Sequence, residues 1–156
     1  MKIVVNDDDF IIYNIKDKFE DLEIDKEKIE KKVKRMLLYI KRKFLKNICG
    51  FYDCLFYSNE KYGFILEVNK ESDLDFFPDL VDLKLKIVKD SKIYLKFNDY
   101  FLIDKYNVYY YKDSYYVDID EISEEDICLL SDFYEVIYGD KLEEIKGKLK
   151  LVVKTC

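Results

Sequence analysis

The sequence predicts a single α+β domain over residues 1–156: a mostly antiparallel β-sheet meander, one long N-terminal amphipathic helix and one shorter C-terminal helix. Apolar residues between 26 and 48 recur at steps of three and four, which is the period of a helix face. From Phe51 onward apolar residues alternate with polar ones, as in half-buried strands. The connections between these strands are too short for crossover helices, and this favours antiparallel neighbours.

The long helix has signals at both ends of its sequence. Asp25 is the expected N-cap, and Gly50 lies just past the expected end. Glu27 and Glu30 occupy the first turns, where the helix dipole favours acids. The apolar stripe consists of Ile29, Val33, Met36, Leu37, Ile40, Phe44, Leu45 and Ile48.

The strands are expected in pairs around polar turns. The chain opens with a hairpin whose strands are 2–5 and 10–15. Alternating or apolar stretches then follow at 51–58, 64–68, 81–88, 93–97, 100–103, 106–112 and 115–119, and 149–153 is a closing strand. The likeliest long loop is 70–79, which contains the only proline of the chain.

The second helix is predicted to begin after Ser123 and to stop before Gly139. Asp126 stands at its third position and imitates a capping box with Ser123. Its apolar stripe consists of Ile127, Leu130, Tyr134 and Ile137.

Composition narrows the functional classes. The chain has no histidine, so a Ser-His-Asp or Cys-His triad is impossible within it, and we find no catalytic or ligand-binding motif. We therefore expect no enzyme activity and no cofactor.

The cysteines point to a cytoplasmic protein without a zinc site. The closest pair of the four has C-x4-C spacing, which is not a zinc half-site, and reduced thiols suit a cytoplasmic protein. No apolar run approaches the ~20 residues of a membrane span, so we expect no membrane partner.

The net charge of −6 is unevenly distributed along the chain. Residues 26–46 hold ten bases and two acids, whereas residues 98–146 hold fourteen acids and four bases. Such asymmetry can steer a charged partner. The basic helix could bind nucleic acid by neutralising phosphates, or its bases could form an ordinary solvated face. The candidate nucleic-acid residues are Lys34, Arg35, Lys41 and Arg42.

A tyrosine-rich hairpin is the first candidate site for a protein partner. A two-residue turn at Asp113-Ser114 would pair Tyr111 with Tyr116. One face would then carry Val108, Tyr110, Val117 and Ile119, with a core-like pattern. The other would carry Tyr109, Tyr111, Tyr116 and Asp118. If these tyrosines are exposed, they would suit protein binding, because tyrosine is enriched at interface hot spots. Alternatively the second helix covers this face and the tyrosines are core.

A cluster of acids follows the hairpin and comprises Asp118, Asp120, Glu121, Glu124, Glu125 and Asp126. Dense carboxylates can hold Ca²⁺ or Mg²⁺, but the EF-hand template fails here because Ile122 and Leu129 fall at ligand positions. A favourable interaction with a helix dipole explains the cluster more simply, so we expect no metal site. The acids could also imitate nucleic-acid phosphates toward a basic protein.

These features favour a non-enzymatic, cytoplasmic protein-interaction domain: an inhibitor, adaptor or immunity-type regulatory protein with an unidentified protein partner. Its contact residues would be Tyr109, Tyr111, Tyr116, Asp118, Glu121, Glu124 and Glu125. A nucleic-acid-binding protein is the alternative, and a carboxylate enzyme that uses Mg²⁺ is the third hypothesis. A homodimer through an edge strand is also compatible with the pattern.

Overall fold

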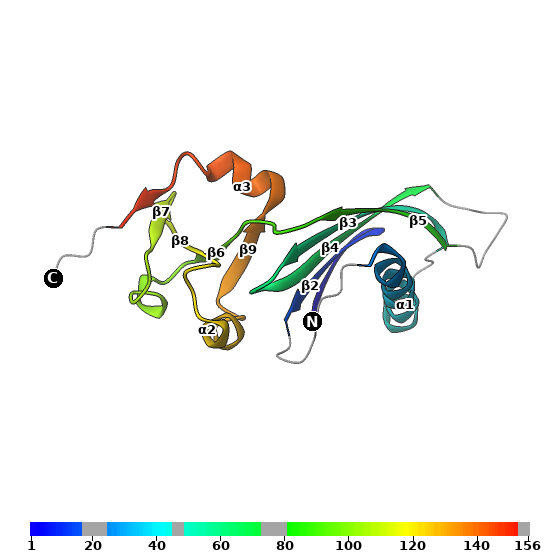
Figure 1. Cartoon of the computed structure of the whole chain (residues 1–156), viewed down its shortest axis with the longest axis horizontal. Coiled ribbons are helices and arrows are strands. Elements are labelled where there is room, and N and C mark those ends of the chain that lie inside the picture. Colours follow the sequence, from blue (N-terminus) through cyan, green and yellow to red (C-terminus); the bar gives the residue numbers. More distant parts are fainter. Residues whose placement is uncertain (17–24, 45–48, 73–80, 153–156) are drawn as a thin grey trace. The chain divides into compact units, whose positions relative to one another are not determined.

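The computed structural model describes residues 1–16, 25–44, 49–72 and 81–152, and it confirms the α+β class. Over these residues ten strands form two five-stranded, mostly antiparallel sheets, accompanied by three α-helices (Figure 1). The chain divides into two compact units, unit 1 (1–58 and 63–89) and unit 2 (59–62 and 90–156). That residues 1–156 fold as a single domain stays a prediction.

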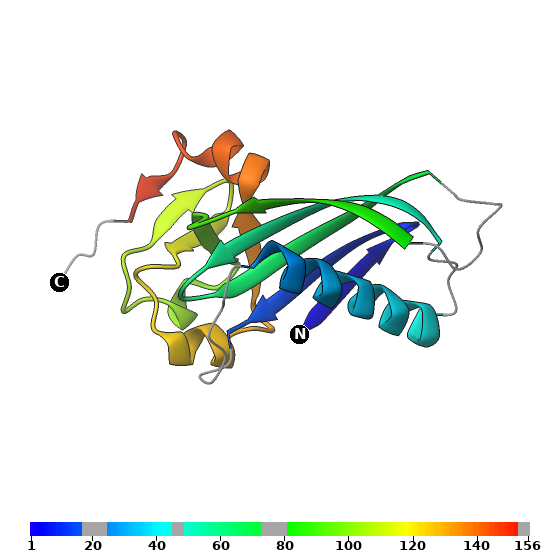
Figure 2. The ribbon, with the colours of Figure 1, turned by 45° about the vertical axis from the view of Figure 1, so that its right-hand side comes forward.

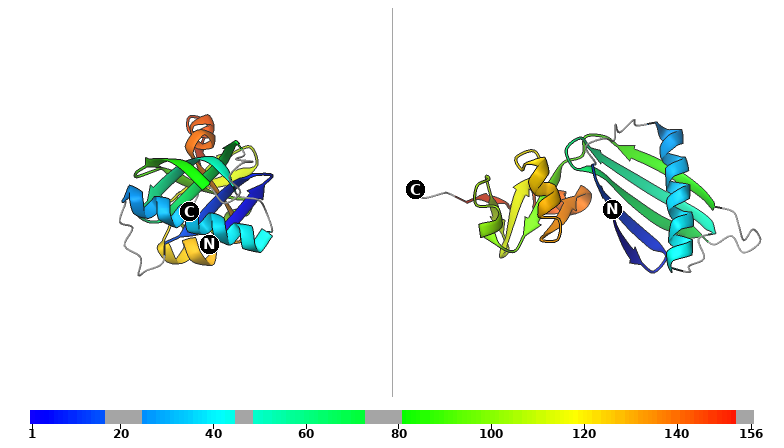
Figure 3. Two further views of the ribbon diagram at one scale, coloured as in Figure 1. Left: turned by 90° about the vertical axis from the view of Figure 1, so that its right-hand side faces the viewer. Right: turned by 90° about the horizontal axis from the view of Figure 1, so that it is seen from below.

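Unit 1 is one sheet with one helix on it. Its elements are β1 (Lys2–Asn6), β2 (Asp9–Ile15), α1 (Lys26–Phe44), β3 (Gly50–Asn59), β4 (Gly63–Ser72) and β5 (Val81–Val88). The strand order is β1-β2-β4-β3-β5, and α1 crosses one face of the sheet (Figures 2 and 3). The predicted opening hairpin and long helix are therefore confirmed.

The apolar stripe of α1 forms the core of unit 1. Ile29, Val33, Leu37 and Ile40 are buried against side chains of the central strands, among them Phe10, Ile12, Tyr52, Cys54, Phe56, Phe64, Leu66 and Val68. Asp25 caps the helix as predicted, because its carboxylate accepts a hydrogen bond from the backbone N–H of Glu27 at 3.0 Å. Leu45 and Ile48 lie outside the described residues, and Gly50 is the first residue of β3.

One pairing in unit 1 departs from the predicted antiparallel meander. β5 pairs with β3 in parallel, with Gly50 opposite Val81. The three-residue connection 60–62 makes β3 and β4 run in opposite directions, so the end of β4 lies beside the start of β3. A chain leaving β4 can therefore enter β5 at that same end of the sheet. No crossover helix is needed for this parallel pair, so the lack of room for one did not exclude it, as the prediction had assumed.

The β3-β4 turn requires specific residues. The side-chain oxygen of Asn59 accepts hydrogen bonds from the N–H groups of Lys61 and Tyr62, each at 2.9 Å, which closes an Asx turn. Gly63 has φ +126°, and an added Cβ would lie 2.2 Å from the backbone oxygen of Asn14. Only glycine fits at this close approach.

Unit 2 is a sheet with a helix against each face. Its elements are β6 (Ile93–Phe97), the 3₁₀-helix η1 (Tyr100–Leu102), β7 (Tyr109–Tyr111), β8 (Ser114–Asp118), α2 (Glu124–Leu129), β9 (Tyr134–Tyr138), α3 (Gly139–Ile145) and β10 (Lys150–Leu151). The strand order is β10-β7-β8-β6-β9. The helices α2 and α3 lie on opposite sides of the sheet (Figure 1). Leu142 of α3 packs beside Tyr116 on one face. On the other face, the backbone carbonyl of Ile127 in α2 accepts a hydrogen bond from the hydroxyl of Tyr134.

Three sequence predictions in unit 2 are corrected. The second helix ends at Leu129, and the stretch expected to continue it forms β9, which pairs antiparallel with β6. Its residues Tyr-Glu-Val-Ile-Tyr are β-branched or aromatic at four of five positions, so they suit a sheet. The apolar piece 100–103 forms η1 rather than a strand. The closing strand is only Lys150–Leu151, and residues 153–156 lie outside the description.

Two neighbouring leucines of α1 test this packing. Leu37 is 1% exposed and Leu38 is 50% exposed. We expect Leu37→Ala to lower the free energy of unfolding by about 2–5 kcal/mol, because it leaves a cavity between helix and sheet. Leu38→Ala should change it by less than about 0.5 kcal/mol. Urea denaturation followed by circular dichroism measures both, and equal losses would contradict the placement of α1.

Candidate functional site

The tyrosine hairpin has a different turn from the predicted one. Tyr109 lies opposite Tyr116, and Tyr111 opposite Ser114, so the turn residues are Lys112 and Asp113. Both have positive φ, 43° and 60°, as a type I′ turn requires. The predicted pairing of Tyr111 with Tyr116 is therefore wrong by two residues. A shift of two preserves the faces, so the predicted grouping still holds for Tyr109, Tyr111, Tyr116 and Asp118.

That face of the hairpin lies under α3. Tyr116 is only 5% exposed and packs with Ile137 and Leu142, while Tyr109 and Tyr111 are half-buried at the edge of the same cluster. Burial, followed by the charge of Glu135, raises the pKa of Tyr116. The alternative in which a helix covers the tyrosines thus describes Tyr116, although the covering helix is α3 rather than the predicted second helix.

The predicted acidic residues are distributed over two faces of unit 2. Asp118 is half-buried at the end of β8. The pKa of Tyr94 is raised, first by the burial of Tyr94 itself and second by the negative charge of Asp118. Glu121, Glu124 and Glu125 are exposed in or just before α2, on the opposite side of the sheet from α3. The structure therefore does not bring these three acids together with the tyrosine face.

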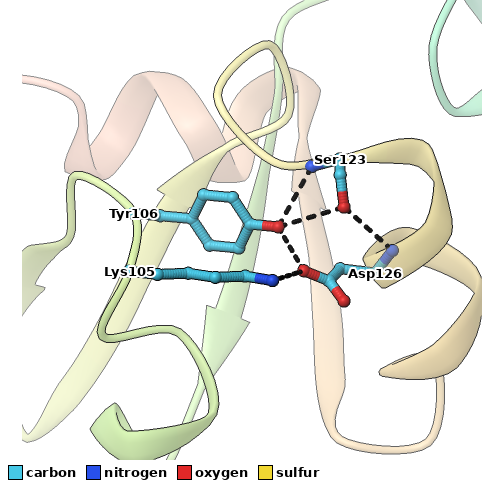
Figure 4. Close-up of polar contacts among 4 residues, drawn as sticks. All are labelled: Lys105, Tyr106, Ser123 and Asp126. Carbon is cyan, nitrogen blue, oxygen red and sulfur yellow. Dashed lines mark hydrogen bonds and ion pairs between the residues drawn. The ribbon is translucent and has the colours of Figure 1, made fainter.

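A polar network joins the loop after η1 to the N-terminus of α2 (Figure 4). Ser123 caps α2 by accepting a hydrogen bond from the N–H of Asp126 at 3.2 Å. Asp126 accepts a hydrogen bond from the hydroxyl of Tyr106 and forms an ion pair with Lys105 at 2.7 Å. These contacts, led by Lys105, lower the pKa of Asp126. The predicted cap at Ser123 is confirmed, but the reciprocal half of a capping box is absent, because the N–H of Ser123 donates to the hydroxyl of Tyr106 at 3.3 Å rather than to Asp126. The network fixes the loop onto α2.

A chain of aromatic rings that the sequence pattern did not predict lies on the α2 side of the sheet. We call it the aromatic row. Ring centroids connect Phe101 to Tyr100 at 6.3 Å, Tyr100 to Tyr115 at 5.6 Å and Tyr115 to Tyr110 at 5.5 Å. Phe101 is 82% exposed and Tyr110 is 38% exposed. Tyr110 thus differs from its predicted core-like role, whereas Val108, Val117 and Ile119 are buried as expected.

Each end of the aromatic row is held by an aspartate. Asp99 caps η1 by accepting a hydrogen bond from the N–H of Phe101 at 2.9 Å. Asp113 accepts a hydrogen bond from the hydroxyl of Tyr110 at 2.9 Å, and this bond is the main cause of the raised pKa of Tyr110. The fold therefore holds the backbone of Phe101 and the hydroxyl of Tyr110 in place.

The predicted nucleic-acid residues lie together on α1 in unit 1. Lys34, Arg35, Lys41 and Arg42 are all exposed. Within the described residues none of the four has an ion pair or hydrogen bond to another side chain. The acids of the chain thus leave these bases unneutralised in the part that the structure describes.

The described residues include no group of three or more Asp, Glu or Cys side chains placed to hold a metal ion. Burial and the neighbouring Asp53 raise the pKa of Cys54 to about 12, so this thiol is a poor nucleophile at neutral pH. None of the described helices is both long and apolar enough to span a membrane.

Comparisons with protein-family models, characterised proteins and solved structures found no match.

The network around Asp126 predicts a pH-dependent stability. Because its pKa is lowered in the folded state, ionised Asp126 stabilises the fold above the ordinary aspartate pKa, and this contribution is lost as the pH falls through the folded value. We therefore expect Asp126→Asn to be less stable than wild type at pH 7, with the difference shrinking below about pH 4.

Ser123→Ala should lower the free energy of unfolding by about 1 kcal/mol, because it removes the side-chain cap of α2.

Thermal unfolding between pH 3 and 7 measures both differences from wild type. Asp132→Asn is the matched control, because Asp132 is an exposed carboxylate outside the network. A gap between wild type and Asp126→Asn that stayed constant with pH, or that Asp132→Asn reproduced, would contradict the role of Asp126.

Proposed function

We propose that this chain is a non-enzymatic protein-interaction domain of the cytoplasm, an inhibitor, adaptor or immunity-type protein, and that the aromatic row is its contact surface. The observation that carries the proposal is the 82% exposure of Phe101 at one end of a continuous set of ring contacts. The unbridged thiols of Cys54 and Cys128 are in keeping with the reducing cytoplasm.

The aromatic row has the physical properties of an interface anchor. Large rings bury much apolar area on binding and dominate the binding energy at many interfaces. Hydrogen bonds to Asp99 and Asp113 already hold the backbone of Phe101 and the side chain of Tyr110, so a partner would not have to offset that loss of freedom. The hydroxyls of its tyrosines can still form hydrogen bonds at a wet rim.

The charge around the aromatic row favours a basic partner. Unit 2 holds sixteen acids and ten bases, whereas unit 1 holds seventeen of each, so the whole net charge of −6 belongs to unit 2. Asp99, Asp104 and Asp113 are exposed on the segments that carry the row. Glu121 is fixed to the same loop, because its carboxylate accepts a hydrogen bond from the amide of Asn107 at 2.9 Å. A basic protein surface would be attracted by this field.

Capture from an extract of the native host, treated with nuclease, tests the proposal. Wild type should retain a specific basic protein that Phe101→Ala retains at least about 30-fold more weakly, the ratio expected for a hot spot. Reversing the charges of Glu121, Glu124 and Glu125 to lysine should slow association and weaken its dependence on salt. Calorimetry and surface plasmon resonance with the captured protein measure the two effects.

Leu129→Ala is the matched control, because Leu129 is an exposed apolar residue of unit 2 outside the aromatic row. It should bind as wild type does. The proposal would be wrong if no protein were retained specifically, or if Phe101→Ala and Leu129→Ala bound the captured protein equally well.

A further inference from the structure

The outer face of α1 is fixed by what its inner face buries. Ile29, Val33, Leu37 and Ile40 contact the sheet, so the line of side chains on the opposite side of the helix points to solvent. With 100° between successive residues, that line consists of Lys28, Lys31, Arg35, Leu38 and Arg42. We call it the outer line of α1, and all five residues are exposed.

Both arginines of the chain lie on this outer line. The sequence contains two arginines against twenty-five lysines, and Arg35 and Arg42 stand seven residues apart, about 10.5 Å along the helix axis. Arginine differs from lysine by its planar fork of donors, which matches a phosphate group with two parallel hydrogen bonds. In a chain that otherwise uses lysine for positive charge, the rarer base is found only where it faces outward on one helix.

The segment of α1 that carries both arginines lacks the acids that a solvated helix usually carries. Residues 31–43 contain seven bases and no acid, although one of them, Lys32, lies over the ring of Phe64 on the sheet side. Ordinary exposed helices mix the two signs, because pairs of opposite charge three or four residues apart are stabilising and pairs of like charge are destabilising. Lys31 and Arg35 are such a like-charge pair. A bound polyanion would relieve this repulsion.

A phosphate backbone fits this surface better than a lipid bilayer does. An amphipathic helix that lies in a membrane must place its apolar stripe into the lipid, but the stripe of α1 is covered by the sheet. Lys31, Lys34, Arg35, Lys41 and Arg42 extend over about 16 Å of helix, and this array of exposed positive charge suits the regular charge of a nucleic-acid strand.

We propose that the outer face of α1 binds the phosphate backbone of nucleic acid without reading its sequence, through Lys31, Lys34, Arg35, Lys41 and Arg42. This surface belongs to unit 1 and is independent of the aromatic row in unit 2. Each chain thus carries one surface for a polyanion and another for a basic protein.

Fluorescence anisotropy of the full chain with a labelled 20-base-pair DNA duplex and a 20-nucleotide RNA tests the proposal. Affinity should fall with salt, and five phosphate contacts predict a slope of about −4.5 for log K against log salt on the duplex. R35A/R42A should reduce the magnitude of that slope by about two and weaken binding at least about tenfold at 50 mM salt.

K2E/K86E is the control for net charge, because Lys2 and Lys86 are exposed bases of unit 1 outside α1. It lowers the charge more than R35A/R42A does and should bind nucleic acid more tightly than that variant. Phe101→Ala should leave nucleic-acid binding unchanged, which separates this test from that of the proposed function. Circular dichroism establishes that each variant is folded.

Four results would overturn the proposal. They are absence of binding at 50 mM salt, a flat salt response, equal losses in R35A/R42A and K2E/K86E, and binding of poly-glutamate or phosphatidylserine vesicles as tight as binding of the duplex. The last would assign the face to an acidic protein or to a membrane instead.

Discussion

Burial of the apolar stripe of α1 against the sheet of unit 1 is the interaction on which the other features of that unit depend. Four side chains, Ile29, Val33, Leu37 and Ile40, are almost completely removed from solvent, and full burial of each contributes about 1.5–3 kcal/mol. This fixes the rotation of the helix about its axis. A helix held in one rotation presents one constant outer line to solvent, so the two arginines cannot turn toward the sheet. The surface that we propose for nucleic acid is thus a direct consequence of the packing of unit 1.

Unit 2 places its surface by a different route. Both faces of its sheet are covered in part, by α2 on one side and α3 on the other, so most of its tyrosines have a structural role. Phe101 of η1 differs from these aromatic residues, because it is 82% exposed. The loop that follows is tied to Ser123 and Asp126, so the exposed rings sit on an ordered platform. The polar contacts that stabilise the start of α2 therefore also hold the loop next to the contact surface that we propose.

Local patterns predicted much of the fold but little of the candidate site. The cap at Asp25, the stripe of α1 and the face shared by Tyr109 and Tyr116 follow from periodicity, and they are present in the structure. The predicted helix failed beyond Leu129 because Tyr134 and Ile137 fit a helical stripe equally well, and pairing with β6 decides for a strand. The aromatic row depends on ring contacts between η1 and a hairpin, which no sequence period encodes. The only local signal was an aspartate, a residue type common at helix caps, two positions before Phe101.

Photo-crosslinking at position 101 tests the central claim, that a protein partner contacts the aromatic row, most directly. p-Benzoylphenylalanine would replace Phe101 in the full chain, with a second variant carrying it at Phe51, an exposed position of unit 1. Irradiation in nuclease-treated host extract should give a discrete protein adduct from position 101 and none from position 51, and excess unlabelled wild type should suppress it. No adduct at position 101, or the same adducts from both positions, would contradict the account.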